Sequence, residues 1–572
     1  MVDQANQSLD IMRFPIVLSV SFAIAASVAA QPPRTGAPRF SVTVAPAAHA
    51  GPLTGRLVVV VAKAAPPDGK APTAEPRFLI SPRGPAMFAV DLSALAPGAP
   101  AIVDQRSIGY PRSLAELPPG DYVAQAVVNV YEQVHRSDGK TIWVHMNDGR
   151  VEFFSNAAGN LYSDVTPVHV GAGGVISLRI THVIPEPPPL TDTDWLKHVK
   201  IQSALLTRFW GRPVFVHAHV LLPKGYADHP DTRYPSIYTL GHGTTPLSFS
   251  TTPPRNGAPN TVNPATGLES GYATYQAWSS ADYPRLIAIT LEQQTPYFPD
   301  SYSVNSANNG PYGDAIVNEI IPELERRFRI IGKPYARQLE GASTSGWQTL
   351  ALQLQHPDFF GGAWIFQPDP IDFARYQMTN IYADSNAFTV ATGPFTSVER
   401  GFQRTTDGQT VITTRDLSRF EAVLGSRGRS GFQLEAWEAV YGPVGDDGYP
   451  VPLWDKLTGH IDHTVAAYMR DHGYDLRAYA EQRWPEIGSQ LVGKLHFSAG
   501  DMDDYWLNLA VYRFEDFLKT TANPHYEGDF VYGRPMKGHA WHSDTWANLV
   551  RKVAAAIKAA APAGENTAAW SY

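Results

Sequence analysis

One short segment carries the residue types needed for nucleophilic catalysis. Residues 341–346 read Gly-Ala-Ser-Thr-Ser-Gly and stand between a stretch typical of a strand and a stretch typical of a helix. A nucleophilic serine in such a turn has a strained backbone, so the residues two before and two after it must be small. Gly341 and Ser345 meet this requirement. We therefore predict that Ser343 is a nucleophile for acyl transfer; the competing interpretation is a polar loop that caps a helix.

An activated serine needs a base, and the base needs an acid that orients it. Residues 494–500 are predicted as a strand, and Asp501, Asp503 and Asp504 follow it directly. These carboxylates cannot all orient one histidine. We predict Asp503 as the acid, with Asp504 and Asp501 as alternates.

The base is expected on a loop near the C-terminus. Residues 537–542, Lys-Gly-His-Ala-Trp-His, offer two histidines. We predict His539, which follows a glycine, with His542 as the alternate. The chain order serine, aspartate, histidine is the order of the α/β type of triad and differs from the other convergent triads.

Backbone N–H groups must hold the oxyanion that forms during acyl transfer. Residues 240–243, Leu-Gly-His-Gly, end a predicted strand about 100 residues before the serine. We predict an oxyanion hole from the N–H groups of Gly243 or Thr244 together with that of Thr344. The alternative for the upstream segment is an ordinary glycine turn.

No cofactor is predicted. The sequence contains no cysteine, which excludes disulfides, thiolate metal sites and a cysteine nucleophile. His460 and His463 are spaced like metal ligands, but no matching ligand set stands elsewhere, so we interpret them as a polar helix face.

Alternating strands and helices must position these groups. A helix over residues 315–329 has apolar residues at near 3.6-residue spacing, and a second helix is predicted over 346–355. Strands are predicted over 214–222, 234–240 and 286–291. This alternation indicates a mostly parallel sheet covered on both faces, which is an α/β fold.

The preceding part of the chain has a residue pattern typical of strands. Between residues 38 and 183, β-branched and aromatic runs alternate with turn residues. The predicted strands are 40–44, 57–61, 78–80, 122–131, 142–144 and 175–180. We predict an immunoglobulin-like β-sandwich over 31–184, a proline-rich linker over 185–199 and a catalytic domain over 200–560.

Two segments carry a family resemblance. Residues 339–347, Leu-Glu-Gly-Ala-Ser-Thr-Ser-Gly-Trp, and 356–361, His-Pro-Asp-Phe-Phe-Gly, resemble the putative-esterase (esterase D-like) branch of the α/β-hydrolases, which includes feruloyl and enterochelin esterases. The resemblance spans roughly 200–555 and implies the serine, an acid within 500–503 and the base at 538–539. Ser345 departs from the family's usual glycine. The long interval from serine to acid implies a cap inserted over about 371–488.

Charge and the first residues restrict location and partners. A net charge of −8 gives no basic face for nucleic acid. An apolar run over 14–26 and the small residues 27–30 predict a signal peptide over 1–30, hence a secreted or periplasmic protein. The run is too short to span a membrane, since about 20 residues are needed.

Together these features predict a secreted serine hydrolase of carboxylic esters that forms an acyl-enzyme. A serine peptidase of the same fold is one alternative. A non-catalytic protein whose sandwich binds carbohydrate or another protein is the second. The sequence leaves the particular ester and any homo-oligomer open.

Overall fold

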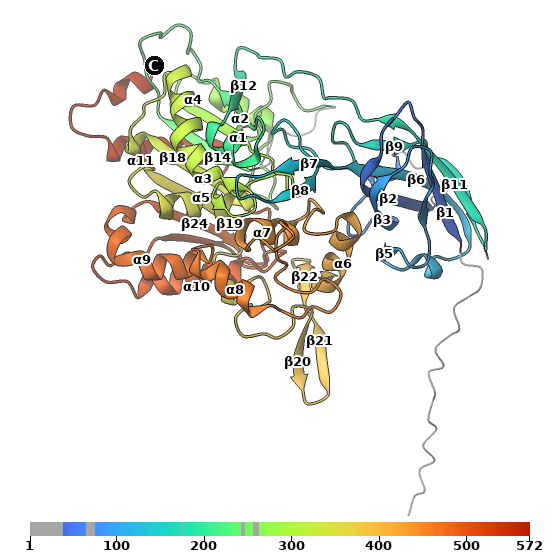
Figure 1. Ribbon diagram of the computed structural model, residues 1–572. Helices are drawn as coiled ribbons and strands as arrows, with labels where there is room; N and C mark the ends of the chain where they lie inside the picture. Colours follow the sequence, from blue (N-terminus) through green and yellow to red (C-terminus); the bar gives the residue numbers. More distant parts are fainter. Residues whose placement is uncertain (1–37, 64–74, 172, 242–245, 256–261) are drawn as a thin grey trace, which may run out of the picture.

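The computed structural model describes residues 38–63, 75–171, 173–241, 246–255 and 262–572. The predicted signal peptide lies outside these residues. Two large sheets dominate the described chain, one on each side of the molecule in Figure 1, with a mainly helical segment beside them.

The first sheet contains the N-terminal strands. In the described residues these are β1 (Arg39–Val44), β2 (Leu53–Lys63), β3 (Ala86–Leu95), β4 (Ala101–Val103), β5 (Ile108–Tyr110), β6 (Gly120–Val130), β9 (Leu161–Ser163), β10 (Thr166–Val170) and β11 (Val175–Val183). They hydrogen-bond in the order β4-β1-β11-β9-β6-β2-β3-β5, with β10 paired to β6. The β-rich character of this region agrees with the sequence, and the immunoglobulin-like sandwich stays a prediction.

Strand β2 is buried on both faces. Leu57, Val59 and Val61 face a core within the N-terminal sheet. Val58 and Val60 face a different core, which also contains residues from the part of the chain after residue 297. A continuous run of β-branched residues is what a strand covered on both sides requires.

One predicted strand is wrong. Residues 78–80 were expected to be extended, but Pro76–Phe78 form a 3-10 helix. Pro76 occupies the start of that helix, where its fixed φ is favourable and its missing N–H costs nothing. The neighbouring strand β3 was not predicted from the sequence.

The second sheet is mostly parallel, as predicted. Its strands in the described residues are β12 (Leu196–Gln202), β13 (Phe215–Leu221), β14 (Ser236–Leu240), β15 (Ile287–Glu292), β18 (Arg337–Ser343), β19 (Gly362–Pro368), β24 (Leu495–Gly500) and β25 (Asp529–Gly533). Their spatial order is β12-β13-β15-β14-β18-β19-β24-β25. The strands from β15 to β25 pair in parallel. Strand β13 is antiparallel to both of its neighbours, β12 and β15. Because β12 begins at Leu196, this sheet starts within the predicted linker.

Helices cover both faces of this sheet. On one face lie α2 (Gly271–Trp278) and α11 (Trp546–Ala560). The other face carries α1 (Ala204–Trp210), α3 (Tyr312–Ala315), a π-helical turn (Ile316–Ile320), α4 (Ile321–Arg327), α5 (Thr344–Gln355), α9 (Leu476–Leu491) and α10 (Asn508–Lys519). The predicted helix over 315–329 is therefore present, and the α/β class is confirmed.

The predicted cap corresponds to the segment between β19 and β24, and we keep the name cap for this segment. It contains β20 (Thr389–Gly393), β21 (Thr396–Glu399), β22 (Gly401–Arg404), β23 (Thr410–Thr413), α6 (Thr414–Leu424), α7 (Gln433–Tyr441) and α8 (His463–Asp471). Figure 1 shows α6 next to β3 and β5 of the N-terminal sheet. Arg56 of β2 donates to the carbonyl oxygens of Ala422 and Val423 at 2.8 and 3.1 Å. The N-terminal sheet is thus bound to the cap by polar contacts and by a shared apolar core.

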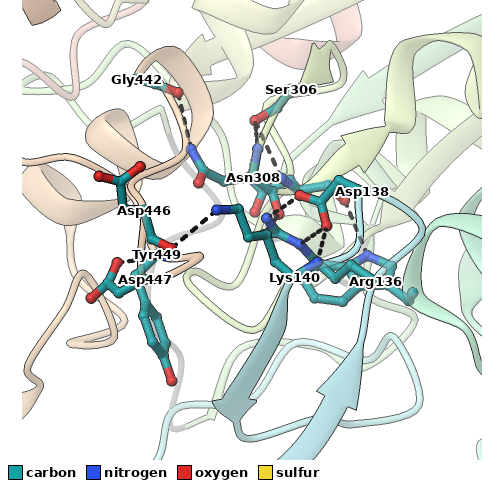
Figure 2. A network of polar contacts seen from close by, with 11 residues as sticks. Arg136, Asp138, Lys140, Ser306, Asn308, Gly442, Asp446, Asp447 and Tyr449 are labelled. Carbon is teal, nitrogen blue, oxygen red and sulfur yellow. Dashed lines mark hydrogen bonds and ion pairs between the residues drawn. The ribbon is translucent and has the colours of Figure 1, made fainter.

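A hairpin of the N-terminal region provides a second connection. Strands β7 (Glu132–His135) and β8 (Thr141–Val144) pair with each other, and their apolar residues lie in the core of the second sheet. Figure 2 shows the polar contacts: Arg136 donates to the Asn308 carbonyl at 3.2 Å, and Lys140 to the Asp446 carbonyl at 3.0 Å. Asn308 in turn donates to the carbonyl of Gly442 at the end of α7, at 3.0 Å.

In the described part of the chain, no helix combines the length and the apolar character needed to cross a membrane.

Candidate active site

Ser343 occupies a sharp turn between β18 and α5. Its φ of 58° and ψ of −123° place it in a conformation that residues with side chains rarely adopt. A Cβ on Gly341 would lie 2.2 Å from the Oγ of Ser345 and 2.5 Å from its backbone carbonyl carbon, so only glycine fits there. This is the strand–turn–helix arrangement of a nucleophile elbow, which the sequence predicted for this segment.

The predicted acid and base lie side by side. Asp503 follows β24, His539 follows β25, and Oδ2 of the first is 2.8 Å from Nδ1 of the second. Asp503 is fully buried, and its other oxygen accepts the N–H groups of Tyr505 and Leu507 at 2.9 and 3.1 Å. Since a carboxylate only accepts, Nδ1 of His539 carries the proton and Nε2 is left as the acceptor.

The charges around His539 favour its protonated form. Burial by itself would lower the pKa of the imidazole. The charge of Asp503, its hydrogen bond, and the charges of Asp369 and Asp504 outweigh burial, so the pKa is raised. The site therefore stabilises the imidazolium that a general base becomes after accepting a proton.

The alternate residues make other contacts. Oδ1 of Asp504 accepts the backbone N–H of His539 at 3.2 Å, and Oδ1 of Asp501 accepts that of Lys537 at 3.1 Å. Both carboxylates hold the loop that carries the histidine. His542 is buried against the Phe366 ring, with centroids 4.7 Å apart, and burial lowers its pKa to about 4.

Of the predicted oxyanion-hole residues, Gly243 and Thr244 lie outside the described residues. Thr344 is the first residue of α5 and is buried. Its backbone N–H belongs to the helix N-terminus, where orphan donors and the helix dipole favour negative charge.

Sequence reasoning missed a buried carboxylate next to the serine. Asp369 directly follows β19 and is 3% exposed, and its Oδ1 lies 3.3 Å from the Oγ of Ser343. Its Oδ2 accepts the hydroxyl of Tyr302 at 2.6 Å and that of Thr344 at 3.1 Å. Burial raises the pKa of Asp369, and these hydrogen bonds oppose the rise.

Helix α7 of the cap completes the surroundings of this carboxylate. Gln433 and Trp437 donate to Oδ2 of Asp369 at 3.0 and 3.2 Å, and both also contact the hydroxyl of Tyr302. Tyr302 belongs to the polar loop that precedes α3. The loop reaches the site through this residue.

Ser343, Asp369 and His539 line one cavity of about 370 Å³. The rest of its wall comes from the cap, from the loop after β24 and from the N-terminal sheet. These residues are Ser81, Pro82, Arg83, Gln377, Phe402, Gln403, Ile412, Leu417, Phe432, Gln433, Trp437, Tyr505 and Leu507. The lining is largely aromatic and aliphatic with a few amide groups, which suits a small organic ligand.

Among the described residues, no group of three or more His, Asp or Glu side chains is placed to hold a metal ion. His463 instead begins α8, and His460 pairs through its backbone with Asn386.

A serine in a strained turn after a central strand of a mostly parallel sheet defines the α/β-hydrolase class of fold. No family model and no curated protein matches the chain. Solved structures of esterases and serine hydrolases do resemble it, at low identity. A ferulic acid esterase is 13% identical, over 64% of this chain and 98% of its own, with a TM-score of 0.34.

Two further solved structures have similar extents. S-formylglutathione hydrolase from Staphylococcus aureus is 14% identical, over 63% of this chain and 99% of its own, with a TM-score of 0.31. A ferulic acid esterase from Anaeromyces mucronatus, in complex with ferulic acid, is 12% identical, over 64% and 90%, with a TM-score of 0.26.

Proposed function

We propose that this chain is a serine hydrolase that cleaves carboxylic esters through an acyl-enzyme. The observation that carries the proposal is the joint position of two features in one cavity. The strained Ser343 and the buried Asp503–His539 pair come from the carboxyl ends of different strands and meet at the same cavity.

The chemistry follows from the proton positions. Oγ of Ser343 attacks the ester carbonyl carbon while Nε2 of His539 takes its proton, and Asp503 stabilises the resulting imidazolium. The tetrahedral oxyanion faces the N–H of Thr344, with the predicted Gly243 or Thr244 as second donor. The imidazolium then protonates the leaving alkoxide. Water, deprotonated by His539, attacks the acyl-enzyme and releases the acid and the free serine.

Asp369 sets the resting state in this scheme. The hydroxyl of Ser343 donates to Asp369, so it must rotate toward His539 before attack. The negative charge of Asp369 also stabilises the imidazolium, because it contributes to the raised pKa of His539. We assign Asp369 as a positioning residue beside the triad.

A fluorophosphonate probe tests the proposal directly, because it reacts with an activated serine. Wild-type protein is expected to be labelled, and Ser343→Ala to lose the label. Ser345→Ala is the matched control, since that serine stands in the same turn and is expected to keep the label. An unlabelled wild type would exclude a serine hydrolase and leave the non-catalytic alternative.

Substrate pairs then separate esterase from peptidase. We expect the wild type to hydrolyse aryl esters with Ser343-dependent turnover and to leave aminoacyl arylamides nearly untouched. Faster cleavage of the amides would assign the site to a peptidase. We also propose export through the predicted signal peptide at 1–30; cell fractionation with the mature N-terminus sequenced is the corresponding test.

A further inference from the structure

A turn of the N-terminal sheet forms part of the catalytic cavity. Ser81, Pro82 and Arg83, which precede β3, line the same cavity as Ser343 and His539. The sheet therefore contributes directly to the surroundings of the reacting atoms.

This turn is held in place. The N–H of Gly84 donates to the Ser81 carbonyl at 2.8 Å, and the hydroxyl of Tyr110 donates to the Pro82 carbonyl at 2.6 Å. A Cβ on Gly84 would lie 2.3 Å from the Leu79 carbonyl oxygen, so the chain closes tightly here. Tyr110 itself belongs to the core shared with the cap. The backbone position of Arg83 is thus fixed by the fold.

Arg83 brings an uncompensated positive charge to the cavity. Its side chain is exposed, and no carboxylate among the described residues forms an ion pair with it. Arg56 of β2 is paired with Asp91, and Arg77 of the 3-10 helix is paired with Glu75. Of the described residues that line the cavity, Arg83 is the one with a permanent positive charge. The Asp369 carboxylate is already engaged by donors on both oxygens.

Arg83 and Tyr505 line the same cavity as the predicted base. Burial chiefly raises the pKa of the Tyr505 phenol, nearby aspartates raise it further, and the charge of Arg83 acts in the opposite direction. The Tyr505 ring packs edge-on against the His539 ring, with centroids 4.8 Å apart. Arg83, Tyr505 and His539 thus line one cavity, and the leaving alcohol is expected beside His539, which protonates it.

We propose that Arg83 binds an anionic group on the alcohol portion of the substrate, so that the enzyme prefers esters whose alcohol carries a free carboxylate. This inference rests on the proposed function. Guanidinium and carboxylate form charge-assisted hydrogen bonds, and the contact requires only the side chain of Arg83 to become ordered, because the backbone of the turn is already held.

Two esters that differ in one charge provide the test. These are 4-butyryloxybenzoate, whose alcohol portion carries a carboxylate, and its neutral methyl ester. The measured quantity is kcat/KM for the carboxylate divided by kcat/KM for the methyl ester, in each variant at low ionic strength. We expect Arg83→Met to lower this ratio roughly 3- to 10-fold, mainly through KM, and Arg83→Lys to retain most of it. Added salt should lower the wild-type ratio, because screening weakens a partly exposed contact.

Arg112→Met is the control. Arg112 is an exposed arginine just after β5 that does not line the catalytic cavity, so its substitution should leave the ratio unchanged. An unchanged ratio in Arg83→Met would overturn the inference while Ser343-dependent hydrolysis of the methyl ester still upheld the proposed function. Hydrolysis of neither ester by the wild type, with no fluorophosphonate label, would overturn both.

Discussion

The hydroxyl of Ser343 donates to Oδ1 of Asp369 at 3.3 Å, a carboxylate other than the one paired with His539. The second oxygen of Asp369 is engaged by groups from α5, from the polar loop before α3 and from α7. A single buried side chain therefore joins the serine turn to the cap. Its charge also reaches the histidine, which gives it a measurable effect on titration.

Asp369→Asn is expected to shift the acid limb of the pH profile of kcat/KM to lower pH. The active base is the neutral imidazole, and removal of the negative charge removes one of the influences that raise the pKa of His539. The variant thus keeps its neutral imidazole at lower pH than the wild type. Asp358→Asn, which removes an exposed carboxylate, is the control and should leave the limb in place. An unshifted limb in Asp369→Asn would show that this charge does not reach the base.

Asp503 and Asp501, two of the three neighbouring aspartates, are distinguished by parallel substitutions. Asp503→Asn should lower kcat by roughly 1,000- to 10,000-fold, because the imidazole loses the partner that orients it and stabilises its charge. Asp501→Asn should lower kcat less than about 10-fold, since its carboxylate accepts a backbone N–H of the loop and does not touch the histidine. The measurement is steady-state hydrolysis of an aryl ester. Equal losses in the two variants would contradict the assignment of the acid.

His542 makes stability depend on pH on the acid side. Burial lowers its pKa to about 4, below its unfolded value, so folding keeps it neutral while the unfolded chain takes up a proton. The contribution of His542 to the free energy of unfolding is complete above about pH 6.5 and is lost as the pH falls toward 4. Between pH 7 and pH 5 the loss amounts to about 2 kcal/mol.

His542→Gln should remove the part of the decrease in stability between pH 7 and pH 5 that His542 causes. The measurement is the free energy of unfolding in urea at the two pH values. The variant is also expected to keep its aryl esterase activity at pH 7, whereas His539→Gln loses it. Loss of activity in His542→Gln with retention in His539→Gln would reverse the assignment of the base.

Arg56 provides a test of the connection between the N-terminal sheet and the cap. Arg56→Met keeps the aliphatic stem but leaves the carbonyl oxygens of Ala422 and Val423 without their donor. We expect a loss of about 2 kcal/mol in the free energy of unfolding, since buried acceptors remain unsatisfied. Arg106→Met removes an exposed ion pair and should cost less than about 1 kcal/mol. Equal losses would mean that the interface contacts contribute little.

The sequence predicted the serine turn and the acid after strands, and the base on a loop near the C-terminus. In the structure the predicted acid and base lie 2.8 Å apart, after β24 and β25. The carboxyl ends of parallel strands meet at one edge of a sheet, so residues far apart in the chain come together there. Ser343, Asp503 and His539 are placed by that rule. The same rule contained a signal for Asp369, since it is an acidic residue directly after β19, but that strand was not predicted as an element of its own.

Other features depend on tertiary packing that no local pattern encodes. Tyr302 reaches Asp369 only because the loop before α3 folds over the serine turn. The side of the cavity formed by Ser81–Arg83 depends on how the N-terminal sheet packs on α6. The sequence of a proline-rich connector gives no indication of that packing. The 3-10 helix at Pro76–Phe78 was mistaken for a strand because a three-residue apolar run has no periodicity to distinguish the two.

The double-sided burial of β2 has a consequence for how the protein can be divided. Val58 and Val60 face a core that includes Phe420 and Val423 of α6. A catalytic fragment that started at the linker would expose this apolar face of the cap, and such patches promote aggregation. The fragment would also lack the Ser81–Arg83 wall and so present a wider, less selective opening. The N-terminal sheet is therefore not an exchangeable accessory module: grafting a different one onto this catalytic part would have to rebuild a core and one side of the substrate cavity together.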